Sequence, residues 1–233
     1  MKKLGLCIAL GLSLGACAGG INSGTMTGNV NQNNVVTQYP VETAMLNIYV
    51  KERSQKLMAV VGNQNVLADI KVTPKGSMVF NNKQVQGTEI NTITKSNNQV
   101  INQSVVINYF TLKPLVFQGF TDSSGEYSLS TQTTTIPKLA KVGDSSPLIT
   151  ETVYSDSSKR KKIGMYSQDW SLTRDTNNTA WFCINSSENT LLAFDPNGAS
   201  VECYKINAKG DILDSRLTIK GPEGVGTINF TSR

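Results

Sequence analysis

The sequence contains no histidine among its 233 residues. Histidine is the base of Ser-His-Asp and Cys-His catalysis and a frequent zinc ligand, so its absence excludes these kinds of site. Aromatic residues make up only 7% of the chain, which argues against a lipid-facing barrel with an aromatic girdle at each interface. We expect no catalytic residue, no metal site and no cofactor.

The first residues have the layout of a secretory signal. Met1-Lys2-Lys3 is a short basic start, and Leu4–Leu14 is apolar or small apart from Ser13. A charged start followed by a short apolar run is typical of signal peptides. A spanning helix needs roughly 20 apolar residues, so this run is too short for a lasting membrane span.

The apolar run ends in Leu14-Gly15-Ala16-Cys17. This motif resembles the lipobox of bacterial lipoproteins, and the resemblance covers about the first 20 residues. It implies a signal peptide over residues 1–16, cleavage before Cys17, a diacylglycerol on that thiol and a further acyl chain, such as palmitate, on the new amino group. The protein would contact the membrane through these chains. Ala18 stands where an aspartate often retains such proteins in the inner membrane, so we expect the outer membrane, facing either the periplasm or the exterior.

The exported chain has modest charge and two remaining cysteines. Removal of Lys2 and Lys3 lowers the net charge from +5 to +3, and a nucleic-acid-binding domain would show a stronger, clustered basic face. We therefore expect no nucleic-acid partner. Cys183 and Cys203 form an even pair in an oxidising compartment, which predicts a disulfide, with two free buried thiols as the alternative.

The residue pattern after the signal peptide predicts a flexible tether followed by an all-β domain. Residues 17–40 are small and polar, as in a flexible segment. Residues 41–233 contain short strands separated by turns, which predicts an antiparallel β-sandwich or a partly open β-barrel. We expect a strand over Ala44–Val50, with a helix over Thr43–Met58 as the weaker alternative. The break at Pro137–Lys141 makes residues 135–147 a candidate boundary between two subdomains.

Two further groups of side chains are candidate binding sites. One is a basic run after a predicted turn, which suits an anionic lipid or protein surface but equally a solvated turn or a protected strand edge. It consists of Lys159, Arg160, Lys161 and Lys162. The other is an aromatic group near the expected disulfide, which suits either a core or a ligand platform. It consists of Tyr166, Trp170, Trp181 and Tyr204.

Three functions remain open on these grounds. The first in rank is a non-enzymatic scaffold of the cell envelope that binds another envelope, secretion or host protein, for example by strand addition. The second is a carrier that holds a lipid or other apolar ligand in a barrel cavity. The third is a histidine-free hydrolase. A hollow of several hundred Å³ would favour the carrier, and two carboxylates about 5–10 Å apart would favour the hydrolase.

Overall fold

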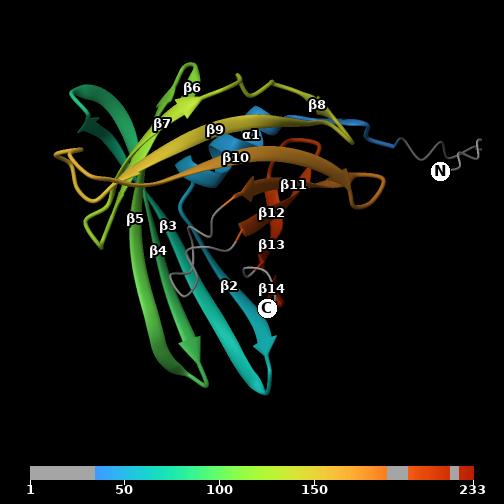
Figure 1. Ribbon diagram of the computed structural model, residues 1–233. Coiled ribbons are helices and arrows are strands. Elements are labelled where there is room, and N and C mark those ends of the chain that lie inside the picture. Colours follow the sequence, from blue (N-terminus) through green and yellow to red (C-terminus); the bar gives the residue numbers. More distant parts are fainter. Residues whose placement is uncertain (1–34, 188–198, 221–225) are drawn as a thin grey trace, which may run out of the picture. The chain divides into compact units, whose positions relative to one another are not determined.

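The structure is a computed structural model, and it describes residues 35–187, 199–220 and 226–233. In this part of the chain, twelve antiparallel strands form a closed barrel (Figure 1). Their order around the barrel is β10-β11-β12-β13-β14-β2-β3-β4-β5-β6-β7-β9, and β9 pairs with β10 to close the ring. The structure confirms the expected all-β antiparallel class. Of the two expected architectures it is the barrel rather than the sandwich, and the ring of strands is closed rather than partly open.

The described chain also contains one helix and a separate two-stranded sheet outside the barrel strand order. The barrel strands are β2 (Arg53–Val61), β3 (Gln64–Phe80), β4 (Lys83–Ser96), β5 (Gln99–Leu112), β6 (Leu115–Asp122), β7 (Tyr127–Gln132), β9 (Ser145–Tyr154), β10 (Lys162–Arg174), β11 (Thr179–Ser186), β12 (Ala199–Asn207), β13 (Ile212–Lys220) and β14 (Thr227–Ser232). The other elements are β1 (Gln38–Tyr39), α1 (Val41–Val50) and β8 (Ala140–Lys141).

The expectation of a strand over Ala44–Val50 is wrong, because this segment belongs to α1. Its buried apolar residues Val41, Ala44, Met45 and Ile48 have the spacing of one helical face. Pro40 precedes the first helical turn and supplies the first backbone acceptor, with Ala44 N donating to Pro40 O at 2.9 Å. The β-branched and aromatic residues that favoured a strand are accommodated because tertiary packing overrides local propensity.

α1 fills one end of the barrel. Its apolar face belongs to the same core cluster as Trp170 and Leu172 of β10 and Phe182 of β11. Asn47 fixes the helix further, since its Nδ2 donates to Gly210 O at 2.9 Å. We call this end, occupied by α1 and its core cluster, the closed end. The opposite end, at the hairpin turns 97–98, 123–126 and 155–161, is called the mouth.

The folded part begins earlier than the expected tether boundary at residue 40. Val36 N donates to Asn177 O at 2.8 Å in the turn between β10 and β11, and Tyr39 is fully buried. β1 pairs with β8, which lies in the connection from β7 to β9. The proposed boundary at 135–147 is thus a connection within one compact unit. Val36 and β1, the first described part of the chain, lie at the closed end of the barrel.

The distal part of the β3–β4 hairpin folds against the outer face of the barrel. The ring of Phe80 stacks on Tyr109 of β5 and Tyr127 of β7, with centroids 4.1 Å and 4.9 Å apart. These three residues share a core cluster with Val85. Asn81 and Asn82 form the tip with positive φ of 47° and 59°, as a tight hairpin turn requires.

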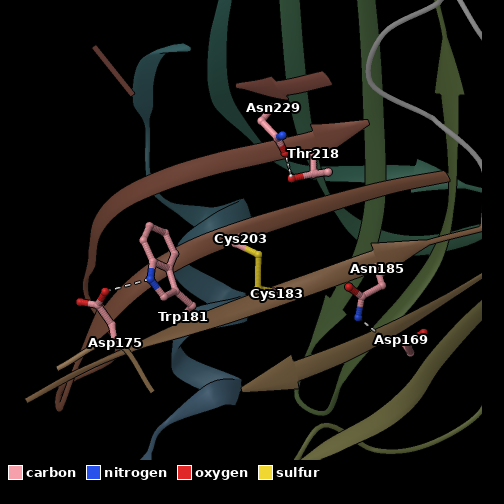
Figure 2. The surroundings of a disulfide bond; sticks show 8 residues. All are labelled: Asp169, Asp175, Trp181, Cys183, Asn185, Cys203, Thr218 and Asn229. Carbon is pink, nitrogen blue, oxygen red and sulfur yellow. Dashed lines mark hydrogen bonds between the residues drawn. A yellow bond between two sulfur atoms is a disulfide. The ribbon is translucent and has the colours of Figure 1, made fainter. Parts of the chain in front are cut away.

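The predicted disulfide is confirmed. Cys183 and Cys203 are directly paired across β11 and β12 and are joined by an S–S bond that closes a loop of 20 residues. They alternate with the inward-facing Phe182 and Tyr204, so the bond lies on the outer face of the barrel. Figure 2 shows it between the two strands, with Trp181 and Asp175 to one side.

Candidate functional site

The barrel encloses a cavity of about 810 Å³ between α1 and the mouth. Ile48 and Tyr49, at the end of α1, form its floor. Its walls come from the inner faces of β4, β5, β6, β9, β10 and β12, and they combine aliphatic, aromatic and polar side chains. This volume falls within the range of roughly 300–1,000 Å³ that is usual for small-molecule sites.

The cavity occupies one side of the barrel because the other side is filled. Leu57, Ala68, Leu217, Ile219 and Phe230, which come from β2, β3, β13 and β14, form a buried cluster of their own. Small and branched side chains on β2 and β3 pack against larger side chains on β13 and β14 and fill this half of the barrel interior. The hollow therefore lies against β4–β6, β9, β10 and β12.

One wall carries a hydrogen-bonded group of Glu202, Tyr204 and Arg53. Tyr204 Oη donates to Glu202 Oε2 at 2.8 Å, and Arg53 Nη2 donates to Tyr204 Oη at 3.3 Å. The Arg53 guanidinium lies over the Tyr204 ring, 5.1 Å from its centroid, and also donates to Ile48 O. Glu202 and Tyr204 line the cavity, whereas Arg53 is not among its lining residues.

Burial governs the ionisation of this group. Burial raises the pKa of the Glu202 carboxyl above its usual value, although the Tyr204 hydroxyl and Arg53 act in the opposite direction. Burial also raises the pKa of the Tyr204 phenol well above its usual value, and the neighbouring Glu202 adds to the effect. The pKa of the Tyr49 phenol is raised chiefly by burial as well, with Glu202 and Glu151 contributing.

A second carboxyl, Glu151, faces the cavity from β9. It is 4% exposed and accepts hydrogen bonds from the hydroxyls of Ser128, at 2.8 Å, and Ser130. Burial raises the pKa of this carboxyl, while the two serine hydroxyls partly offset the shift. The two acids that line the interior thus come from strands far apart in sequence, which the closure of the barrel brings around one hollow.

The structure divides the predicted aromatic platform. Tyr166 and Tyr204 line the cavity, while Trp170 points inward but belongs to the closed-end core. Trp181 lies on the outer face, where its Nε1 donates to Asp175 Oδ1 at 3.0 Å and the guanidinium of Arg216 lies 4.2 Å from its ring centroid. The four residues therefore form no common surface.

The basic run begins in the β9–β10 turn beside the mouth and ends at Lys162, the first residue of β10. Lys159 Nζ donates to Asn81 Oδ1 at 3.0 Å and lies over the Tyr127 ring, so it holds the β3–β4 tip against the barrel. Arg160, Lys161 and Lys162 are exposed. Cys17, the predicted lipidation site, lies outside the described residues.

Sequence reasoning missed the two interior acids and the phenol beneath them. Glu151 shares one face of β9 with Ile149 and Val153. Glu202 shares one face of β12 with Tyr204 and Ile206. The available signal was an acidic residue two positions away from apolar residues on a strand. Residues two positions apart share a face, so such an acid lies on the face that the apolar residues bury. Tyr49 gave no comparable signal, since its segment was expected to be a strand.

No helix in the described ranges is both long and apolar enough to cross a bilayer. The candidate site within the described residues is the barrel cavity, which is lined by four carboxyl side chains, two of them deep in the barrel (Glu151 and Glu202), and by several aromatic rings. A comparison of the chain with known protein families, with curated proteins and with solved structures finds no match in any of the three.

Proposed function

We propose that this protein is a non-enzymatic lipoprotein of the cell envelope whose barrel binds a small amphiphilic ligand. The observation that carries the proposal is the cavity of about 810 Å³ inside the barrel, closed at one end by α1. Protein interiors are normally packed to the density of organic crystals, so an unfilled hollow of this size is a feature that folding alone does not require. Among the functions left open by the sequence, the carrier is the one that uses it.

The cavity lining suits a ligand with both apolar and polar parts. Ile90, Val106 and Phe117 offer apolar contact, and burial of ligand surface against them contributes about 25 cal/mol per Å². Asn102 and Ser104 lie nearer the mouth and supply polar groups. Apolar walls with a few placed polar groups are the usual composition of a small-molecule site.

The proposed anchor fits this arrangement. Val36, near the start of the described residues, lies at the closed end, where its backbone N donates to Asn177 O at 2.8 Å. Acylation of Cys17 would hold the protein at the outer membrane, because two or more acyl chains give stable attachment. We propose that the barrel samples ligand from this tethered position.

A fluorescence titration tests the binding proposal. The exported chain with Cys17→Ser, which needs no detergent, is titrated with Nile red, a neutral apolar dye. Val106→Trp places a large ring in the cavity, whereas Val105→Trp places the same ring on the opposite face of β5, because neighbouring strand residues point to opposite faces. We expect binding by the parent and by Val105→Trp and a loss of at least tenfold in affinity for Val106→Trp. Equal binding by both variants, or by none of the three proteins, contradicts the proposal.

A second candidate is the scaffold, which one feature of the barrel wall favours. β14 and β2 share only the register pairs Thr231–Met58 and Ser232–Leu57, although β2 continues to Val61. Among the described strands, none pairs with this side of the β2 end, and Val60 is 67% exposed there. An unpaired strand edge can accept a strand of another protein.

Site-specific photocrosslinking distinguishes the scaffold. A photoreactive phenylalanine at Val60 is compared in intact cells with one at Leu213, which is also exposed but lies on β13. The scaffold predicts a discrete crosslinked band of one size from position 60 and none from position 213. No band, or the same bands from both positions, speaks against a partner at this edge.

The hydrolase has the interior acids Glu151 and Glu202 in its favour. It predicts turnover of a chromogenic glycoside that is lost in both Glu151→Gln and Glu202→Gln. Binding of such a compound without turnover agrees with the carrier.

A further inference from the structure

The charge of the cavity lining is opposite to the charge of the whole chain. The sequence carries a net charge of +5. The cavity is nevertheless lined, among the described residues, by the carboxyl side chains of Asp122, Glu126, Glu151 and Glu202 and by no lysine or arginine. A cleft lined by one sign of charge with low-dielectric walls focuses its field on the ligand.

The two deep carboxyls have few donors of their own. Glu151 is held by two serine hydroxyls, which are neutral. Glu202 receives one hydrogen bond, from Tyr204 to Oε2, and its Oε1 accepts none from the residues that the structure describes. Arg53 offsets Glu202 only in part, since it reaches the cavity wall through the Tyr204 hydroxyl. No ion pair joins either glutamate to a cation in the described ranges.

The same hollow is lined by aromatic rings. Tyr49 contacts Phe117 edge-on at the floor, with centroids 5.2 Å apart, and Phe120, Tyr166 and Tyr204 belong to the walls. The face of an aromatic ring attracts a cation within about 6 Å, and recognition of alkylammonium groups uses several such faces together. Rings and carboxyls therefore favour the same kind of ligand.

The mouth side of the cavity contains an unused polar atom. The Nδ2 atom of Asn102 is buried and has no hydrogen-bond partner among the described residues, and Asn102 lines the cavity. Buried polar groups in proteins are nearly always satisfied. An acceptor atom on a bound ligand would satisfy this one, so the mouth side of the cavity offers a ligand a hydrogen-bond donor.

We propose that the ligand of this cavity is an organic cation, an amine or quaternary ammonium on an apolar body, whose charge lies between Glu151 and Glu202. This inference rests on the proposed binding function and deepens it. An anionic amphiphile of the same size would bring its charge into a buried site that offers no cation among its described lining residues, and an unpaired buried charge is strongly unfavourable.

Three compounds that share one chain length test the charge preference. Decyltrimethylammonium, decanol and decyl sulfate are titrated below their micelle concentrations into the exported chain carrying Cys17→Ser, at pH 8, by calorimetry and by displacement of Nile red. We expect the ammonium compound to bind at least tenfold more tightly than the sulfate, with decanol between them. The test is stringent because the net positive charge of the chain attracts the sulfate to its surface.

Matched variants locate the preference. Glu151→Gln and Glu202→Gln each remove one interior charge at nearly constant size, and we expect each to reduce the ratio of ammonium to sulfate affinity at least fivefold. Glu52→Gln is the control, because its side chain is 67% exposed, pairs with Lys71 at 3.7 Å and does not line the cavity. Circular dichroism confirms that each variant folds, and either of the two interior variants suffices for the comparison.

The outcomes separate this inference from the proposed function. Three results overturn the inference: equal affinity for the three compounds, a preference for the sulfate, or a preference for the ammonium compound that survives both interior substitutions. If the parent still binds Nile red, the carrier function stands in each of these cases. Failure of the parent to bind Nile red and all three decyl compounds overturns the carrier itself. A preference that is lost in Glu52→Gln to the same extent as in the interior variants also overturns the inference.

Discussion

Tyr204 and Glu202 lie two positions apart on β12 and are joined by a hydrogen bond of 2.8 Å from the Tyr204 hydroxyl to the Glu202 carboxylate. Because side chains two positions apart on a strand share a face, the pair is fixed on the inner wall of the barrel. Arg53, from the strand after α1, donates to the same hydroxyl. The phenol thus couples a cation near the closed end to an acid that faces the cavity.

Removal of this hydroxyl leaves the acid without its donor. In Tyr204→Phe we expect the free energy of unfolding to fall by about 1–3 kcal/mol, the usual cost of an unsatisfied buried partner. The loss of the donor also raises the pKa of Glu202 further, so the variant loses ammonium affinity at a higher pH than the parent. Urea unfolding and a pH series of calorimetric titrations measure the two effects. Unchanged stability together with an unchanged pH profile contradicts the role given to Tyr204.

Glu151 makes stability depend on pH in a defined direction. Burial raises its folded pKa above the ordinary 4.5, so the folded state holds a proton that the unfolded state has released, and stability falls as pH rises through this window. The lowered pKa of Asp175, from 3.8, acts only at more acidic pH. We expect the melting temperature to decrease from pH 5 to pH 8 in the parent.

Glu151→Gln provides the comparison for this effect. It keeps the shape of the side chain but removes the titration, so we expect a shallower decrease and equal or higher stability at pH 8. Thermal melts followed by circular dichroism measure both, with Glu52→Gln as the control at an exposed site. If the melting temperature of Glu151→Gln decreases as steeply with pH as that of the parent, the pH dependence of stability comes from other groups.

The disulfide should support the fold without supporting the site. It closes a loop of 20 residues on the outer face of the barrel, for which chain entropy gives about 3 kcal/mol. We expect Cys183→Ala with Cys203→Ala to melt about 6–12 °C lower, at 2–4 °C for each kcal/mol. Nile red affinity below the melting range should remain within about twofold, because Cys203 points to the opposite face of β12 from the cavity-lining Glu202 and Tyr204, and no residue of β11 is among the described lining residues. A large loss of affinity in the folded variant contradicts this separation.

The anchor is tested by changing one atom. Cys17→Ser removes the thiol that we propose as the lipid acceptor, so we expect the protein to move from the membrane fraction to the soluble fraction and to lose incorporation of labelled palmitate. Cys7→Ser serves as the control, because Cys7 precedes the predicted cleavage site. Membrane association and labelling that persist in Cys17→Ser show that another feature attaches the protein.

Local chemistry made most of the fold predictable. The all-β class followed from short strands and turn residues, and the structure places Asn97-Asn98 in a hairpin turn with positive φ of 48° and 67°. Asp122 likewise holds its turn by accepting from Ser124 N at 3.0 Å and Glu126 N at 2.8 Å. The prediction that Cys183 pairs with Cys203 needed only the expectation of an oxidising compartment and an even number of remaining cysteines.

The features that sequence did not predict depend on contacts between distant segments. α1 is a helix because Ile48 and its neighbours meet β10–β12 at the closed end, whereas its local composition favoured a strand. The cavity lies beside β5 and β10, which meet in the core cluster at the closed end, whereas β2 and β13 pack against each other in a cluster of their own. Periodicity shows which face of a strand is inward, but only closure of the ring shows whether that interior is filled.

Native mass spectrometry tests the central claim, ligand binding in the barrel, most directly. The exported chain with Cys17→Ser, produced in its own host, is analysed beside its Val106→Trp and Val105→Trp variants. The account predicts a non-covalent adduct of a small organic molecule on the parent and on Val105→Trp, and none on Val106→Trp. An adduct of equal abundance on all three proteins, or no adduct and no uptake of Nile red by the parent, would contradict it.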